Sequence, residues 1–404
     1  MRGNGADQTD HDSIRWSRRR FLTATVALGA SAGLAACQPP VPTGGTGNTG
    51  PAAPAPKPDG WDEIVRAAKA EGSLIVYAAT SPDVERVFVE DFGAAYPEIK
   101  LQGVYSGGND IVTRVMAERQ AGRYIPDVVV TGSFSMLETM KPQGIVAPLQ
   151  SAFMLPEVSD SSKWLQNTMW WADTNEPYTT LNFQGLLATP VFVNPTLVDP
   201  NSFTSYWDFV DPKWKGKIVS NDIRQTGPGG VPARFIYKHP DLGGEWFERL
   251  YGEMDVTISS DQRQMVDWLV QGRFPILLFV SNNEFVLAKQ QGLPISVVPI
   301  ETFKEGGAIG PGGGSLAWFD RAPHPNAAKV FINWLLSREG QTAWQKQTKL
   351  PSLRIDIPKE GLIEEYVPKR NYTYVDGGSE EYGRVTADVF RDLITRALDK
   401  AVRS

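Results

Sequence analysis

The chain has 404 residues, a formal net charge of −6 at pH 7 and a single cysteine. Its length allows two domains, and the absence of a basic stripe argues against nucleic acid as a partner. One cysteine cannot form an intrachain disulfide, so we expect the hydrophobic core alone to hold the fold.

The first forty residues carry the pattern of an export signal. Ser17–Leu22 contains the twin-arginine pattern, and the apolar run that follows, Phe21–Ala36, is too short to span a membrane. The run ends in Leu34-Ala35-Ala36-Cys37, which resembles a lipoprotein signal-peptidase site. We therefore expect residues 1–37 to be a signal peptide and Cys37 to be lipidated.

The segment after Cys37 has almost no apolar bulk. Residues 38–59 are rich in Pro, Gly, Thr and Ala, a composition that cannot bury enough surface to order itself. They should form a disordered tether. The expected protein is exported by the twin-arginine route and anchored by lipid at the cell membrane, facing the periplasm or the cell exterior.

The next hundred residues alternate between strand and helix patterns. Apolar residues at helical spacing begin at Trp61, and Glu71-Gly72 should end that helix. Three apolar runs predict buried strands, each followed by a helix: Leu74–Ala78, Ile99–Tyr105 and Asp127–Val130. This order predicts a parallel, doubly wound sheet.

The loops after these three strands hold small polar residues: Thr80-Ser81, Ser106–Asn109 and Thr131–Ser133. Ligands bind at the carboxyl ends of strands in an open parallel sheet, where helix N-termini offer unpaired amides. Each loop alone is explained as well by helix capping, because Ser, Thr and Asn are good N-caps. Together they favour a polar and anionic ligand.

One segment of the second half of the chain carries several structural signals. Asp211-Pro212 should end an element, Ile218-Val219 should begin a buried strand, and the Gly-rich stretch up to Gly230 should leave amides free to face a ligand. Further strands are expected over Phe274–Val280 and Leu293–Ile300.

Two later segments carry glycines that we interpret by their position. We expect Gly306–Ser315 to be a flexible hinge-side loop. Pro325 should open a helix, and Gly340 should break it.

Two motifs resemble those of bacterial extracellular solute-binding proteins of ABC importers. The run Trp207–Ile218 is similar to the signature that opens the second lobe, in the branch that binds iron, phosphonates or polyamines. Ala322–Lys329 and Ser337–Gln341 are similar to a later helix of the family. The resemblance covers Trp61 to about Leu350.

The resemblance implies an α/β fold with two doubly wound lobes joined by hinge strands, of the type II periplasmic-binding kind. Residues 60–187 and 302–350 would form the first lobe, and 188–301 and 351–404 the second. The implied function is that of a monomeric substrate-binding lipoprotein that closes on a small solute and delivers it to an ABC permease.

The ligand is expected to be a small anion such as a phosphonate or phosphate-like compound. Asn283 and Glu284 stand where iron-binding members carry two adjacent tyrosines, and ferric iron needs such hard anionic ligands. Arg224 could pair bidentately with an oxyanion or belong to an ordinary ion pair. The expected ligand-binding residues are Thr80, Ser81, Gly107, Gly108, Ser133, Arg224, Thr226, Gly227, Asn282 and Asn283.

Other functions stay open on the sequence alone. Ferric iron, a sugar or a polyamine, which Glu284 could pair with, are alternative ligands, and ligand sensing is an alternative role. An enzyme is disfavoured, because the only histidines after Cys37 are His239 and His324, each beside proline, and no nucleophile motif is present. We expect no cofactor and no metal site.

Overall fold

A computed structural model describes residues 59–79, 81–225, 227 and 229–403 of the chain. The expected signal peptide with Cys37, and residues 38–58 of the expected tether, lie outside the described residues.

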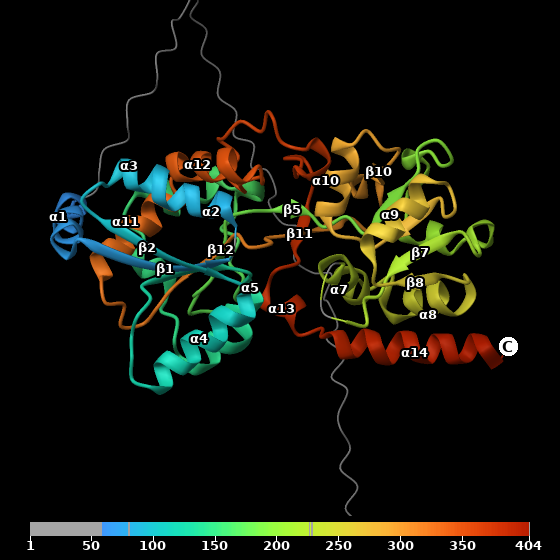
Figure 1. Ribbon diagram of the computed structural model, residues 1–404, viewed down its shortest axis with the longest axis horizontal. Helices are drawn as coiled ribbons and strands as arrows, with labels where there is room; N and C mark the ends of the chain where they lie inside the picture. The colour runs from blue at the N-terminus through green and yellow to red at the C-terminus, as the bar shows by residue number, and fades with distance from the viewer. Residues whose placement is uncertain (1–58, 80, 226, 228, 404) are drawn as a thin grey trace, which may run out of the picture. The chain divides into compact units, whose positions relative to one another are not determined.

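The three apolar runs at the start of the folded chain form β1, β2 and β3 of a five-stranded sheet of order β2-β1-β3-β12-β4 (Figure 1). Strand β1 lies parallel to both β2 and β3, as predicted, and β12 and β4 add an antiparallel edge. The strands are β1 Ser73–Ala79, β2 Lys100–Ser106, β3 Val128–Thr131, β4 Leu181–Asn182 and β12 Ser315–Trp318. The edge strands come from segments far apart in sequence, which periodicity alone does not pair.

Helices cover this sheet. Helix α1 ends at Glu71, as predicted, because Gly72 takes a left-handed φ of 65° and donates its amide to Ala68. Helix α2 continues through a π-helical turn, Val87–Phe92, into α3. The helices are α1 Trp61–Glu71, α2 Pro82–Arg86, α3 Gly93–Ala95, α4 Gly108–Gln120, α5 Ser133–Ser135, α6 Pro156–Ser159, α11 Pro325–Leu336 and α12 Arg338–Thr348.

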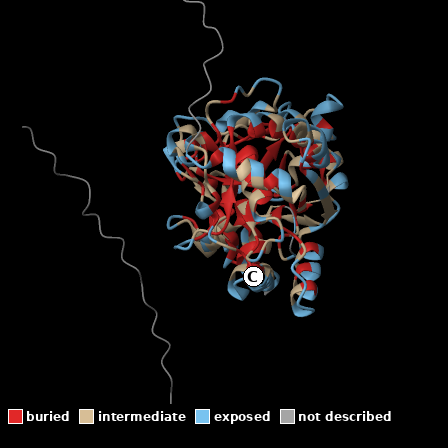
Figure 2. Cartoon of the chain, turned by 90° about the vertical axis from the view of Figure 1, so that its left-hand side faces the viewer, coloured by how far each residue is buried: buried red, intermediate tan, exposed pale blue. Residues whose placement is uncertain are grey.

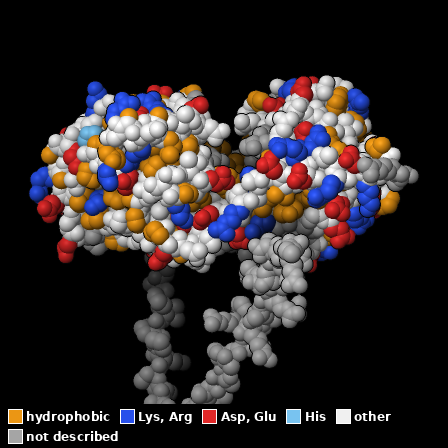
Figure 3. All heavy atoms as spheres, turned by 90° about the horizontal axis from the view of Figure 1, so that it is seen from below, with side chains coloured by type: hydrophobic (Ala, Val, Ile, Leu, Met, Phe, Trp, Pro, Cys, Tyr) orange, Lys and Arg blue, Asp and Glu red, His pale blue; other side chains and the backbone are white. Residues whose placement is uncertain are grey.

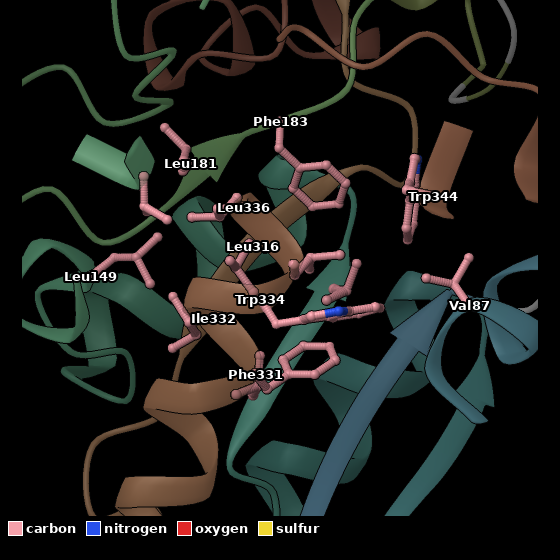
Figure 4. Close-up of a cluster of buried hydrophobic side chains, with 14 of the residues drawn as sticks. Val87, Leu149, Leu181, Phe183, Leu316, Phe331, Ile332, Trp334, Leu336 and Trp344 are labelled. Carbon is pink, nitrogen blue, oxygen red and sulfur yellow. The ribbon is translucent and has the colours of Figure 1, made fainter. Parts of the chain in front are cut away.

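The first core lies between β1, β12 and α11. Figure 4 shows Phe331, Ile332 and Trp334 of α11 converging with Leu316 of β12. Trp344 of α12 belongs to the same core, and so does Leu353 beyond it. Figure 2 shows the same layering, with buried strands behind helices whose outer faces are exposed.

The expected role of Gly340 was wrong. Pro325 does open α11, but the break falls at Ser337, and Gly340 lies inside α12. Ser337 ends one helix and caps the next, since its hydroxyl donates to Trp334 O over 2.7 Å and accepts from Gly340 N over 3.2 Å. A Cβ on Gly340 would overlap the carbonyl of Trp334, so the glycine is needed for close approach of the two helices.

A second five-stranded sheet has the order β10-β6-β9-β7-β8. Strands β7, β8 and β9 are parallel, and β6 and β10 are antiparallel to their neighbours. Ile218 begins β7, as predicted. The strands are β6 Val191–Val193, β7 Ile218–Asn221, β8 Thr257–Ser259, β9 Ile276–Leu278 and β10 Ser296–Val297. The expected strand over Leu293–Ile300 is therefore shorter than its apolar run.

Helices α7 to α10 accompany the second sheet, and the C-terminal α14 packs along α8. Their bounds are α7 Gly230–Lys238, α8 Gly243–Glu253, α9 Gln262–Val270, α10 Asn282–Gln290, α13 Glu380–Gly383 and α14 Ala387–Arg403. The α/β class with two doubly wound sheets is thus confirmed.

A third sheet, β13-β11-β5, joins the two larger ones in Figure 1. Its strands are β5 Leu186–Leu187, β11 Gly307–Gly310 and β13 Tyr374–Asp376. The expected flexible loop over Gly306–Ser315 was wrong, because Gly307–Gly310 is a fully buried strand. A Cβ on Gly307 would overlap Ile300, so this glycine serves packing rather than mobility.

Candidate functional site

A cavity of about 750 Å³ opens where the first sheet, the second sheet and the β5–β11 pair meet. A cavity of this volume is large enough for a small organic solute. Its lining combines aliphatic side chains with backbone and small polar groups. The lining includes Ala79, Ser81, Asp83, Val84, Val130, Gln184, Leu186, Leu187, Thr189, Gly227, Gly229, Gly230, Val231, Val280, Ser281, Asn282, Asn283, Gly310, Gly312, Gly313, Trp344 and Leu350.

Three helices begin at this cavity. Ser81, Gly229 and Ser281 are the N-cap residues of α2, α7 and α10, and all three line it. The amides of a first helical turn have no intrahelical partner, and that end of a helix carries a partial positive charge. The cavity wall is therefore suited to an anionic or hydrogen-bond-accepting ligand.

The caps differ in what their side chains do. Ser281 Oγ accepts from Glu284 N over 3.4 Å, whereas Ser81 makes no side-chain cap bond within the described residues. The Ser81 hydroxyl is thus available to a ligand. Gly229 is required by its position, since φ is 81° and a Cβ would overlap Phe279.

Side-chain charge in the cavity is sparse. Asp83 is the one charged residue among the described lining residues, and it forms an ion pair with Arg86 on the same helix. No tyrosine or histidine belongs to this described lining, so hard ligands for ferric iron are limited to one paired carboxylate. The donor set does not fit ferric iron.

A buried amide side chain supports the cavity wall. Gln184 is 1% exposed and donates Nε2–H to Pro311 O over 2.8 Å, while its Oε1 accepts from Trp344 Nε1 over 2.8 Å. Gln184 and Trp344 were missed by sequence reasoning. Nothing in the local sequence marks either residue, because both are defined by contacts between distant segments. Gln184 follows β4, Trp344 belongs to α12, and Pro311 follows β11.

The structure brings together four of the expected ligand-binding residues. Ser81, Gly227, Asn282 and Asn283 line the cavity, although they come from three separate segments. Ser133 lies with Gly227 on a smaller adjoining cavity of about 310 Å³. Thr80 and Thr226 lie outside the described residues.

The remaining expected residues have other surroundings. Gly107 and Gly108 begin α4 and line neither cavity, and a Cβ on Gly108 would lie 2.8 Å from Ser135 Oγ. Glu284 is also outside the described lining of both cavities.

Arg224 is held by a neighbour. Its Nε lies 2.8 Å from Asp222 Oδ1 and its Nη2 lies 2.9 Å from Asp222 Oδ2, a bidentate ion pair. The hydrogen bonds from Arg224 hold the pKa of Asp222 below its ordinary value. Arg224 lines neither cavity among the described residues.

Comparison with known proteins decides the family. Residues 77–342 match the family model described as "Bacterial extracellular solute-binding protein". The chain belongs to this family. It is a type II periplasmic solute-binding protein, the substrate-binding component of an ABC importer.

The relatives of this solute-binding protein are distant. An uncharacterized protein of Haemophilus influenzae is 22% identical over an alignment of 304 residues that covers 71% of this chain and 79% of the relative. The periplasmic binding protein AfuA of Actinobacillus pleuropneumoniae, solved with fructose-6-phosphate, is 18% identical with a TM-score of 0.54, covering 82% of this chain and 99% of AfuA. The Bordetella ferric binding protein is 17% identical with a TM-score of 0.60, at 82% and 99% coverage.

The family and the fold are those of binding proteins rather than enzymes. Family members are extracellular or periplasmic, with a small-molecule ligand and an ABC permease as partners. Within the described part of the chain, no helix combines the length and apolar character needed to cross a bilayer.

Proposed function

We propose that this solute-binding protein captures a small organic anion, such as a phosphonate or a phosphate ester, and delivers it to its permease. The observation that carries the proposal is the convergence of the N-termini of α2, α7 and α10 on one cavity. Oriented amides and helix dipoles stabilise an oxyanion without a surrounding cluster of cations.

The neighbours' ligands are consistent with more than one cargo. AfuA was solved with a sugar phosphate, and the Bordetella neighbour is a ferric binding protein. The lining of this cavity favours the first kind of cargo, because it offers hydroxyls, amides and aliphatic surface but no phenolate among its described residues. Ferric iron, a polyamine and a sugar are the competing outcomes of the test.

A thermal-shift screen tests the ligand class. Wild-type protein is heated with phosphate, phosphonates, sugar phosphates, free sugars, polyamines and ferric ion, since a ligand of the native state raises Tm by mass action. The proposal requires the largest rise with a phosphonate or phosphate ester. A rise with ferric ion or a polyamine alone would overturn it.

We further infer that binding closes two lobes about the third sheet. The lobes would follow the two large sheets, residues 60–187 with 302–350 and 188–301 with 351–404. Because Leu353 is buried in the first core, we propose that the first lobe extends past residue 350 and that the last crossing follows Leu353. Strands β5 and β11 would bend when a ligand bridges the sheets.

Anchoring by lipid at Cys37 after twin-arginine export remains our proposal for localisation. The motifs at Ser17–Leu22 and Leu34–Cys37 support it. In cells, Cys37→Ala should move the protein from the membrane fraction to the soluble fraction. Replacing Arg18 and Arg19 by lysine should block export, and an unaltered distribution of both variants would contradict this localisation.

A further inference from the structure

A second cavity, of about 310 Å³, adjoins the larger one. The two cavities share the lining residues Gly227, Gly230, Val231 and Gly312, so they lie directly beside each other. The lining of the smaller cavity comes mainly from α5, α7 and the start of α14. Figure 1 labels these three helices.

The two cavities differ in charge. Arg234 of α7 lines the smaller one and is the sole lysine or arginine among the described lining residues of either. It is partly buried, and burial lowers the pKa of its guanidinium. A partly desolvated cation is costly unless an anion lies beside it.

The guanidinium is fixed in place but not neutralised. Nε donates to Val385 O over 2.8 Å, and the guanidinium carbon lies 4.6 Å from the centre of the Phe134 ring. Within the described residues, no carboxylate forms an ion pair with Arg234. Burial lowers the pKa of the guanidinium more than the charge of Glu138 raises it. The N–H groups of both terminal nitrogens are therefore able to donate to a ligand, in the forked geometry that suits oxyanions.

Arg224, in the loop between β7 and α7, offers a contrast. Its guanidinium is paired with Asp222, whereas Arg234 lines a cavity and has no such ion pair among the described residues. Of the two arginines, Arg234 is the one placed to meet a solute.

We propose that Arg234 binds the anionic end of the solute in the smaller cavity, while an uncharged body fills the larger one. This assignment rests on the proposed function and narrows it to organic oxyanions that carry a neutral body. The apolar part of the larger cavity, with Leu186, Val231 and Trp344, suits that body. Neutral analogues of the solute would leave Arg234 without a partner.

The test pairs each anion with its neutral body. Ethyl phosphate, glycerol 3-phosphate and glucose 6-phosphate are titrated beside ethanol, glycerol and glucose by calorimetry. Wild-type protein should bind a charged member and not its neutral partner. Arg234→Gln should weaken that binding about ten- to a hundred-fold, the range for a hydrogen bond to a charged group.

Two variants separate binding from structure. Arg234→Lys keeps the charge without the fork and should recover part of the lost affinity. Arg249→Gln removes a cation from the exposed side of α8, outside both cavities, and should bind as wild type does.

Each result has a meaning. Unchanged binding by Arg234→Gln would overturn the role of Arg234 and leave the proposed function standing. Equal binding of a charged compound and its neutral body would overturn both, because the neutral body would then be the ligand. If no charged member binds wild-type protein, the proposed class of solute itself fails, and the role of Arg234 with it.

Discussion

Trp344 Nε1 donates to Gln184 Oε1 across 2.8 Å, and this bond joins α12 to the chain segment that runs from β4 to β5. Both residues line the larger cavity. Gln184 also holds Pro311 O, beside the glycines that follow β11. One buried amide therefore fixes three segments of the cavity wall.

Gln184→Ala should damage both stability and binding. The substitution leaves the Trp344 N–H without its partner, which costs about 1–3 kcal/mol, whereas the Pro311 carbonyl keeps the hydrogen bond from the Gly314 amide. Urea unfolding measures the loss. The exposed Gln290→Ala on α10 serves as control and should unfold within about 0.5 kcal/mol of wild type. Equal midpoints for both variants would show that the network does not hold the wall.

Asn282→Asp should act in opposite directions on stability and on binding. A carboxylate in the first turn of α10 favours the helix dipole by about 0.3–1 kcal/mol. In the cavity, the same charge repels an anion, so affinity should fall about ten-fold or more. Thermal unfolding and calorimetry measure the two effects.

Asn109→Asp is the matched control for that experiment. Asn109 is exposed in the first turn of α4, outside the described lining of both cavities. It should gain the same small stability without losing affinity. Equal losses of affinity in the two variants would mean that the ligand does not lie at α10.

Gly340→Ala should destabilise the protein by about 3 kcal/mol or more, because its Cβ would overlap the Trp334 carbonyl in a buried helix junction. Gly93→Ala is the natural comparison, since Gly93 is helical and its Cβ would meet nothing within 4 Å. That variant should be unchanged or stabilised by up to about 1 kcal/mol. Denaturant midpoints for the two variants decide the matter, and a stable Gly340→Ala would refute the packing argument.

Asp376, in β13, should make stability depend on pH. Burial raises its pKa to about 7, although Asn182 Nδ2 and Gly378 N donate hydrogen bonds to it. The native state therefore holds a proton that the unfolded chain, with an aspartate pKa of about 3.9, releases. This contribution is full below about pH 4 and is lost as pH rises through about 7.

Asp376→Asn removes that titration. Between pH 5 and 8, the decline in unfolding free energy should be about 2 kcal/mol smaller than in wild type. Asp388→Asn, on an exposed carboxylate of α14, should keep the wild-type decline. Identical pH profiles for wild type and Asp376→Asn would contradict the assignment.

The first three strands, the end of α1 and the start of α11 were predicted correctly because those features are local. Apolar runs, Gly72 and Pro325 act within a few residues of their own position. Gly307 and Gly340 were misinterpreted because each is required by close packing in the fold, Gly307 against Ile300 and Gly340 against the Trp334 carbonyl. A glycine demanded by packing and one demanded by flexibility look alike in a sequence.

The same limit applies to the site. Ser81 and Asn282 were found because they follow buried strands, a local signal of a helix N-terminus at the sheet edge. Arg224 and Arg234 both lie near the Gly-rich segment. Only the fold distinguishes Arg224, which forms an ion pair with Asp222, from Arg234, which lines a cavity.

Titration calorimetry with a phosphate ester or phosphonate selected by thermal shift is the decisive measurement of anion binding in the larger cavity. We expect one ligand per chain, with affinity weakened about ten-fold or more in Asn282→Asp and unchanged in Asn109→Asp. Binding that ignores Asn282→Asp, or binding of ferric ion or a polyamine in place of every anion, would contradict this expectation.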